Sequence, residues 1–215
     1  MFDKKVTYLY LFTAIIYLAS LPFTTYPFQF SVKALPILLL FLTCFSQLES
    51  RHKIFMSLAL LFSMTGDIFL SISSPMSFQY GLGAFLIAHL CYGIYFLTLK
   101  SNTNNRQPQY IELVAILGFA GVAAYIILPH TSSLMVPVAT YLVVISIMAM
   151  IAFYKGLNNQ VKLGVCFFLV SDTLLATNLF VAPFSAASYL VMVTYYLAQY
   201  YITRGIFAQS IHKAA

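Results

Sequence analysis

Two aspartates stand where the surrounding residues are almost entirely apolar. Asp67 lies within the apolar segment 61–70, and Asp172 directly follows the apolar segment 167–171. An ionisable group in such surroundings is costly and needs a structural or functional reason. Burial favours the protonated form of a carboxyl group, and a second carboxylate nearby favours it further, so one carboxyl remains protonated while its partner is ionised. The pair would then supply a general acid and a base, which suits hydrolysis of an ether or a related bond.

Other polar side chains also stand in apolar segments. His89 has Tyr92 on the same helical face three residues later, and Tyr195 and Gln199 share a face at a spacing of four. Lys33 opens a further apolar segment. Tyr195 and Gln199 are expected to complete a polar pocket. Two aspartates and one histidine lack the close spacing of metal ligands, so neither a metal nor another cofactor is predicted.

Each of these residues also has a purely structural interpretation. Lys33 would reach the outer membrane interface with its long side chain. His89 would pack against a tyrosine as its hydrogen-bond partner. Asp67 and Asp172 would hold helices together through serine, threonine or tyrosine partners. Two carboxylates in matched apolar segments are an expensive way to join helices, which favours a functional site.

Composition indicates the kind of element that positions these residues. The chain has 215 residues, of which 61% are hydrophobic and only 7% charged. Globular proteins carry roughly 25% charged residues, so a soluble fold and a disordered chain are both excluded. Apolar segments long enough to cross a bilayer core of about 30 Å recur throughout. The sequence therefore predicts an all-α polytopic membrane protein with eight transmembrane helices, at 7–22, 31–47, 53–73, 77–99, 110–128, 133–155, 161–183 and 185–207.

The distribution of basic residues predicts the orientation. All of the 11 Lys and Arg residues except Lys33 fall on one side of the membrane if both termini are cytoplasmic. These residues are Lys4, Lys5, Arg51, Lys53, Lys100, Arg106, Lys155, Lys162, Arg204 and Lys213. The net charge of +6 is therefore assigned to membrane orientation, and nucleic-acid binding is not predicted. Short loops favour a bacterial cytoplasmic membrane.

The sequence also shows a possible internal repeat. The shift that carries Asp67 onto Asp172 lays the first four spans on the last four, and it matches Phe62 with Phe167 and Tyr95 with Tyr200. An even number of spans in each half makes such a repeat parallel. We thus interpret the chain as one eight-helix domain, 1–215, that is compatible with repeat halves 1–105 and 106–215.

Several short segments, in their order along the chain, resemble the YhhN family of integral membrane proteins. They are Lys33-Ala34-Leu35-Pro36, Gly66-Asp67-Ile68-Phe69-Leu70, Ala88-His89-Leu90-Cys91-Tyr92, Ser171-Asp172 and Tyr195-Tyr196-Leu197-Ala198-Gln199. The resemblance covers nearly the whole chain. It departs from the family at Lys33-Ala34, where many relatives are expected to have Lys-Pro.

The resemblance implies a lysoplasmalogenase, which hydrolyses the vinyl ether bond of a lysoplasmalogen to a fatty aldehyde and glycerophosphoethanolamine or glycerophosphocholine. Protonation of the carbon beta to the ether oxygen gives an oxocarbenium ion that water captures. Asp67 is taken as the acid, and Asp172 as the ionised group that stabilises the cation and orients water. The expected substrate-binding residues are Lys33, His89, Tyr92, Tyr195 and Gln199, with Lys33 at the phosphate.

Two alternatives remain open from the sequence. A transporter built on a parallel repeat would use the aspartates to relay protons. An intramembrane aspartyl protease would also use paired aspartates, but Gly66-Asp67 lacks the second glycine of its GxGD motif and Ser171-Asp172 lacks the expected tyrosine. The expected partners are the lipid substrate and the bilayer, and the sequence does not predict an oligomeric state.

Overall fold

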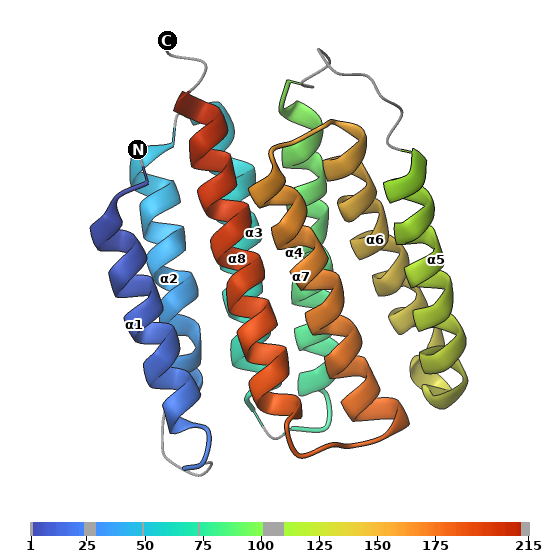
Figure 1. Cartoon of the computed structure of the whole chain (residues 1–215). Coiled ribbons are helices and arrows are strands. Elements are labelled where there is room, and N and C mark those ends of the chain that lie inside the picture. The colour runs from blue at the N-terminus through green and yellow to red at the C-terminus, as the bar shows by residue number, and fades with distance from the viewer. Residues whose placement is uncertain (1, 24–28, 49, 73, 101–109, 212–215) are drawn as a thin grey trace. The chain divides into compact units, whose positions relative to one another are not determined.

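The computed structural model describes residues 2–23, 29–48, 50–72, 74–100 and 110–211. The segment 101–109 between the predicted fourth and fifth spans, with Arg106, and the basic residue Lys213 lie outside these ranges. Eight α-helices occur in the described residues, as predicted (Figure 1). They are α1 Lys4–Ser20, α2 Gln29–Gln47, α3 Ser50–Leu70, α4 Ser77–Thr98, α5 Tyr110–Ile127, α6 Met135–Tyr154, α7 Asn159–Ala176 and α8 Ala187–Ile211. Short helical turns η2 Leu128–His130 and η3 Ser132–Leu134 precede α6, and a π-helical turn η4 Thr177–Val181 follows α7.

Local capping sets several helix ends. Helix α1 begins at Lys4, earlier than predicted, because the Asp3 side chain accepts a hydrogen bond from the Lys5 N–H at 3.0 Å. Asn158 caps α7 in the same way by accepting from the Val161 N–H at 3.0 Å. Helix α6 ends at Tyr154, and Gly156 follows two residues later with a φ of 60°, the left-handed conformation that favours glycine.

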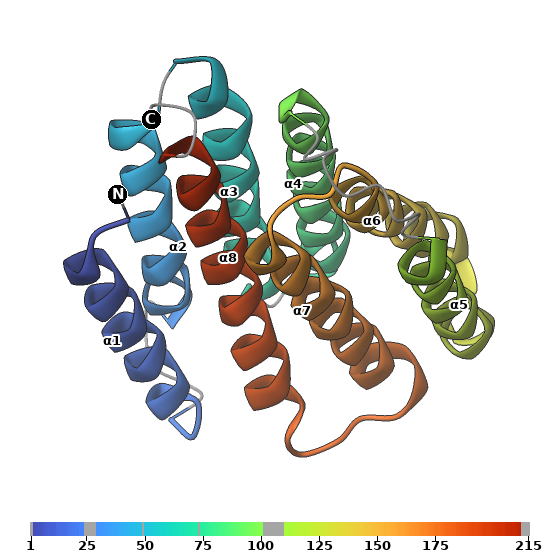
Figure 2. The same ribbon diagram turned by 45° about the horizontal axis from the view of Figure 1, so that its top comes forward.

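The contacts divide the chain into two compact units. Unit 1 comprises Met1–Tyr92 and Thr203–Ala215, and unit 2 comprises Gly93–Ile202. In unit 1, α2 lies between α1 and α3 and contacts both (Figure 1). In unit 2, α6 contacts both α5 and α7, and α5 and α6 run side by side in both views (Figure 2).

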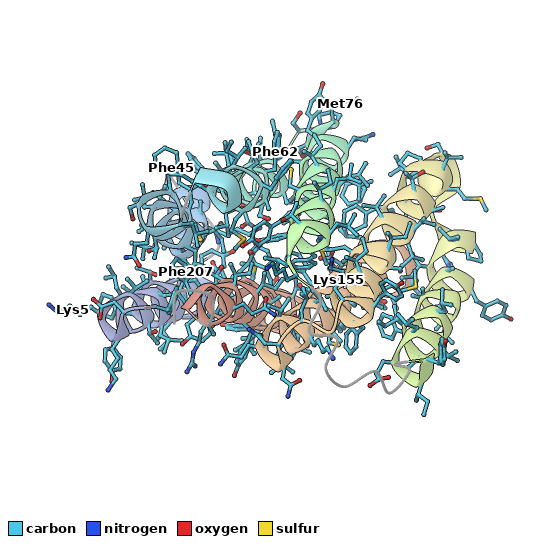
Figure 3. The ribbon with its side chains drawn as sticks, turned by 90° about the horizontal axis from the view of Figure 1, so that it is seen from above. Lys5, Phe45, Phe62, Met76, Lys155 and Phe207 are labelled. Atoms are coloured by element: carbon cyan, nitrogen blue, oxygen red, sulfur yellow. The ribbon has the colours of Figure 1, made fainter. Side chains whose placement is uncertain are left out.

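The helices suit a membrane protein. Six segments are long and apolar enough to cross a bilayer: Gln29–Gln47, Lys53–Leu70, Ser77–Thr98, Tyr110–His130, Ser132–Tyr154 and Asn159–Val181. Helix α1 has only 17 residues, and α8 carries several tyrosines and Arg204. Large apolar side chains such as Phe45, 52% exposed, project outward from the helices (Figure 3). The chain is therefore an integral membrane protein with an all-α fold.

The ends of the chain agree with an even number of spans. The rings of Phe2, before α1, and Phe207, near the end of α8, lie 5.4 Å apart in unit 1. Within unit 2, the Lys155 ammonium at the end of α6 donates to the Leu97 carbonyl at the end of α4, at 3.1 Å. A cation beside a helix C-terminus is favourable, so this contact joins two ends that the topology assigns to the same side.

Candidate functional site

Lys33 and Asp67 form a buried ion pair in unit 1. The Lys33 Nζ lies 3.3 Å from Asp67 Oδ1, and the two side chains are only 10% and 3% exposed. The same ammonium also approaches the Asp67 carbonyl at 3.5 Å. Lys33 thus turns inward to Asp67 instead of reaching the membrane interface, which corrects the snorkelling interpretation. An ammonium at this distance stabilises the ionised form of the carboxyl group.

The ion pair lies near one end of its two helices. Asp67 occupies the last turn of α3, which ends at Leu70, and Lys33 lies in the second turn of α2, which begins at Gln29. The Ser71 hydroxyl, just past α3, donates to the Asp67 carbonyl at 2.8 Å. Asp67 lies closer to the outer end of its helix than the predicted span 53–73 implies, because α3 ends at Leu70.

Close packing between α3 and α4 sets the level of His89. A Cβ added at Gly66 would lie 2.5 Å from the Phe85 ring, and Phe69 packs on Tyr80 with ring centroids 5.4 Å apart. Because the two helices are antiparallel, one turn back along α3 from Gly66 reaches Ser63, and one turn forward along α4 from Phe85 reaches His89. Ser63 and His89 therefore stand at the same level, and both are fully buried.

Tyr92 continues this face of α4. It lies one turn beyond His89 on the same side of the helix and is fully buried. The sequence-predicted residues of unit 1 are thus brought together on neighbouring faces of three helices: Lys33 on α2, Asp67 on α3, and His89 and Tyr92 on α4.

Unit 2 holds the second aspartate with a different partner. The Tyr141 hydroxyl donates to Asp172 Oδ2 at 2.6 Å. Asp172 lies in the last turns of α7, just before the π-helical turn, and Tyr141 lies in the second turn of α6. The neighbouring Ser171 hydroxyl donates to the Val191 carbonyl of α8 at 3.0 Å. Tyr141 was missed because tyrosines are common in membrane helices and no charged residue lies near this one in the sequence.

Tyr195 and Gln199 are buried on α8, on the shared face that their spacing predicts. The Tyr195 ring packs edge-on against Phe168 of α7, with centroids 5.6 Å apart. Gln199 is fully buried. Both residues belong to unit 2, with Asp172 and Tyr141.

The described residues hold no cluster of three or more His, Cys, Asp or Glu side chains that is suited to bind a metal ion. Unit 1 thus offers a carboxylate paired with a lysine, and unit 2 offers a carboxyl group bonded to a tyrosine hydroxyl.

The chain is similar to known proteins along most of its length. The YhhN family profile matches residues 28–206. A lysoplasmalogenase of Mycobacterium bovis is 32% identical over 154 residues, which span 69% of this chain and 59% of the mycobacterial protein. Lysoplasmalogenase TMEM86B of Homo sapiens is 32% identical over 187 residues, which span 85% of this chain and 76% of the human protein. The corresponding protein of Sus scrofa is 32% identical over 150 residues, 69% of this chain and 61% of its own. No solved structure matches the chain.

Proposed function

The chain belongs to the YhhN family, and on that premise we propose that it is a lysoplasmalogenase. It would hydrolyse the vinyl ether bond of a lysoplasmalogen and release a fatty aldehyde with glycerophosphoethanolamine or glycerophosphocholine. The names of the similar mycobacterial and mammalian proteins support this activity. The structural observation that carries the proposal is the buried, ion-paired carboxylate of Asp67. Charged groups are costly inside a membrane and typically mark functional sites.

We assign Asp67 the role of base. Its Lys33 partner places an ammonium group beside the carboxyl group, and in this proposal Asp67 accepts a proton from water and stabilises a nearby cation. This reverses the assignment made from the sequence, in which Asp67 is the acid. Lys33 is proposed to pair with Asp67, and this role replaces the expected contact with the substrate phosphate.

We assign Asp172 the role of acid. The assignment follows from the division of roles between the two aspartates, since Asp67 faces the Lys33 ammonium and Asp172 is bonded by the Tyr141 phenol. Tyr141 also fixes the carboxyl orientation through a short hydrogen bond. In this proposal Asp172 gives its proton to the carbon beta to the ether oxygen, which is the demanding step of vinyl ether hydrolysis.

The proton balance closes over the full reaction. Protonation by Asp172 produces an oxocarbenium ion, and water attacks its cationic carbon while Asp67 takes a proton from that water. The hemiacetal then breaks its bond to the glycerol oxygen, which receives the proton from Asp67. The hemiacetal hydroxyl returns its proton to Asp172, so both aspartates regain their starting states and the aldehyde is released.

The other buried polar residues are proposed to bind the substrate. His89 and Tyr92 on α4, and Tyr195 and Gln199 on α8, offer ring nitrogen, hydroxyl and amide groups to the glycerol hydroxyl and the ether oxygen. Buried polar groups of this kind give a lipid site its specificity, since most of the remaining contact with the chain is apolar. The protein is proposed to act in a bacterial cytoplasmic membrane.

Aldehyde release from a defined lysoplasmalogen by the purified chain in detergent tests the activity. The intact plasmalogen, and a lysolipid whose ether is saturated, serve as controls. We expect aldehyde from the lysoplasmalogen alone, because the saturated ether has no vinyl carbon to protonate and the intact plasmalogen lacks the free glycerol hydroxyl that the site is proposed to bind. Folded protein that releases no aldehyde, but takes up the lipid into proteoliposomes in response to a proton gradient, would contradict the proposal and favour a transporter.

A further inference from the structure

Ser63 is a fully buried hydroxyl that makes no hydrogen bond to any of the residues the structure describes. Hydroxyls in helices often donate to a carbonyl one turn earlier, as at Thr65 on α3 and at Ser71 just past its end. Thr65 donates to the Leu61 carbonyl at 2.9 Å, and Ser71 to the Asp67 carbonyl at 2.8 Å. The Ser63 hydroxyl makes no such bond to its own helix, and a buried hydroxyl without a partner is suited to bind a polar ligand.

The position of Ser63 on α3 shows where that ligand would lie. With about 100° per residue, Ser63 lies roughly 40° around the helix from Asp67 and roughly 60° on the other side from Gly66. Asp67 contacts Lys33 of α2, and Gly66 contacts Phe85 of α4. Ser63 therefore faces the space between α2 and α4, one turn inward from the carboxylate and level with His89.

We propose that Ser63 binds the water molecule that attacks the substrate, and holds it beside Asp67. This inference rests on the proposed lysoplasmalogenase function. The Ser63 hydroxyl and the Asp67 carboxylate bind the water from one face of α3, and Asp67 accepts its proton as the oxygen joins the cationic carbon. A water needs two to four polar partners to be held in a buried site, and these side chains supply them.

Competition between water and methanol for the oxocarbenium ion tests this placement directly. Attack by water yields aldehyde, and attack by methanol yields a mixed acetal, with the methanol proton passing to Asp67. Replacing Ser63 by alanine removes one hydrogen bond to the water, and the space left by the hydroxyl can take the methyl group of methanol. We expect the ratio of acetal to aldehyde to rise about three- to tenfold in Ser63→Ala, the factor that corresponds to one lost hydrogen bond.

Ser57 provides a matched control. It is a buried serine on the same helix, and its hydroxyl likewise lacks a partner in the described part of the chain. It lies about 15 Å along the helix from Asp67, too far to touch the same water. We expect Ser57→Ala to keep the wild-type product ratio, since a change in packing alone alters turnover or stability and not the choice of nucleophile.

The outcomes separate the inference from the proposed function. Wild-type protein that releases no aldehyde would overturn the function. Active Ser63→Ala with an unchanged product ratio would overturn the water site alone, as would a raised KM for lysoplasmalogen with no change in ratio, because Ser63 would then bind the glycerol hydroxyl. Folded but inactive Ser63→Ala beside active Ser57→Ala would support the site. If Ser63→Ala does not fold, Ser63→Cys, which fills the space with a weak donor, is compared in the same way.

Discussion

A buried ion pair is held by the mutual dependence of its two charges. Taking either charge out of water is costly, and the pair offsets that cost only while both members are present. Lys33 and Asp67 are enclosed between α2 and α3 with almost no exposed side-chain area. The stability of unit 1 should therefore be sensitive to the loss of one charge and tolerant of the loss of both.

We expect Lys33→Met to lower the free energy of unfolding by about 3–5 kcal/mol, because it leaves Asp67 charged and unpaired. Adding Asp67→Asn to Lys33→Met should restore part of that loss. Denaturant unfolding of both single variants and the double variant in detergent measures the coupling. Additive effects would show that the pair has no energetic coupling.

For single residues, the sequence was informative where a charged side chain stands in an apolar segment. Asp67 and Asp172 could be found because carboxylates are rare in apolar segments. Lys33 was misinterpreted, because a lysine near a helix end can reach either the membrane interface or a neighbouring charge. Only the packing of the helices decides between the two. Tyr141 and Ser63 are ordinary residues in membrane helices, and their roles depend on what the next helix presents.

Small residues at helix contacts determine how closely two helices can approach. An added Cβ at Gly66 would meet the Phe85 side chain at 2.5 Å, and one at Gly164 would meet the Ile202 backbone nitrogen at 2.8 Å. Among the described residues, and apart from the helix's own nearby backbone, no atom lies within 4 Å of such a Cβ at Gly118. Small residues of this kind let membrane helices pack closely.

We expect Gly164→Ala to destabilise the protein most and Gly66→Ala less, because a phenyl ring can shift and backbone cannot. Gly66→Ala should cost about 1–3 kcal/mol, as overpacking does, while Gly118→Ala should be neutral or stabilising. Thermal unfolding in detergent gives the order, and Phe85→Leu should relieve Gly66→Ala. An equal effect at Gly66 and Gly118 would contradict the close approach of α3 and α4.

The elements themselves were largely predictable, since eight apolar segments gave eight helices with ends displaced by a few residues. The displacements have local causes. Asp3 adds a turn to α1 by capping it, and the predicted seventh span ends in a π-helical turn that hydropathy does not register. Turns of this type often occur beside functional residues, and this one follows Asp172.

The parallel repeat stays a prediction, with one structural feature in its favour. Asp67 on α3 is bonded from α2, and Asp172 on α7 is bonded from α6. The shift that superposes the two aspartates carries Lys33 onto Val138, one turn from Tyr141. An experimental structure in which α1–α4 superpose on α5–α8 only in the inverted orientation would contradict it.

For the molecule as a whole, the positive-inside pattern and the contact between Phe2 and Phe207 lead to one topology. We expect a green fluorescent protein fused after residue 215 to fluoresce in bacterial cells, since it folds only on the cytoplasmic side. A fusion after residue 183, behind the seventh span, should be dark. The reverse pattern would mean that the membrane orientation is wrong, and two bright fusions would mean that the number of spans is wrong.

The proposed mechanism depends on two aspartates that divide the roles of acid and base. Turnover of the isosteric amide variants tests this division. Asp67→Asn and Asp172→Asn should each lower aldehyde release from lysoplasmalogen by about 100-fold or more in folded protein, the scale of a lost acid or base. Asp3→Asn is the matched control, because asparagine caps a helix as well as aspartate does, and it should keep wild-type turnover. Near-normal turnover in both the Asp67 and the Asp172 variant would contradict the account.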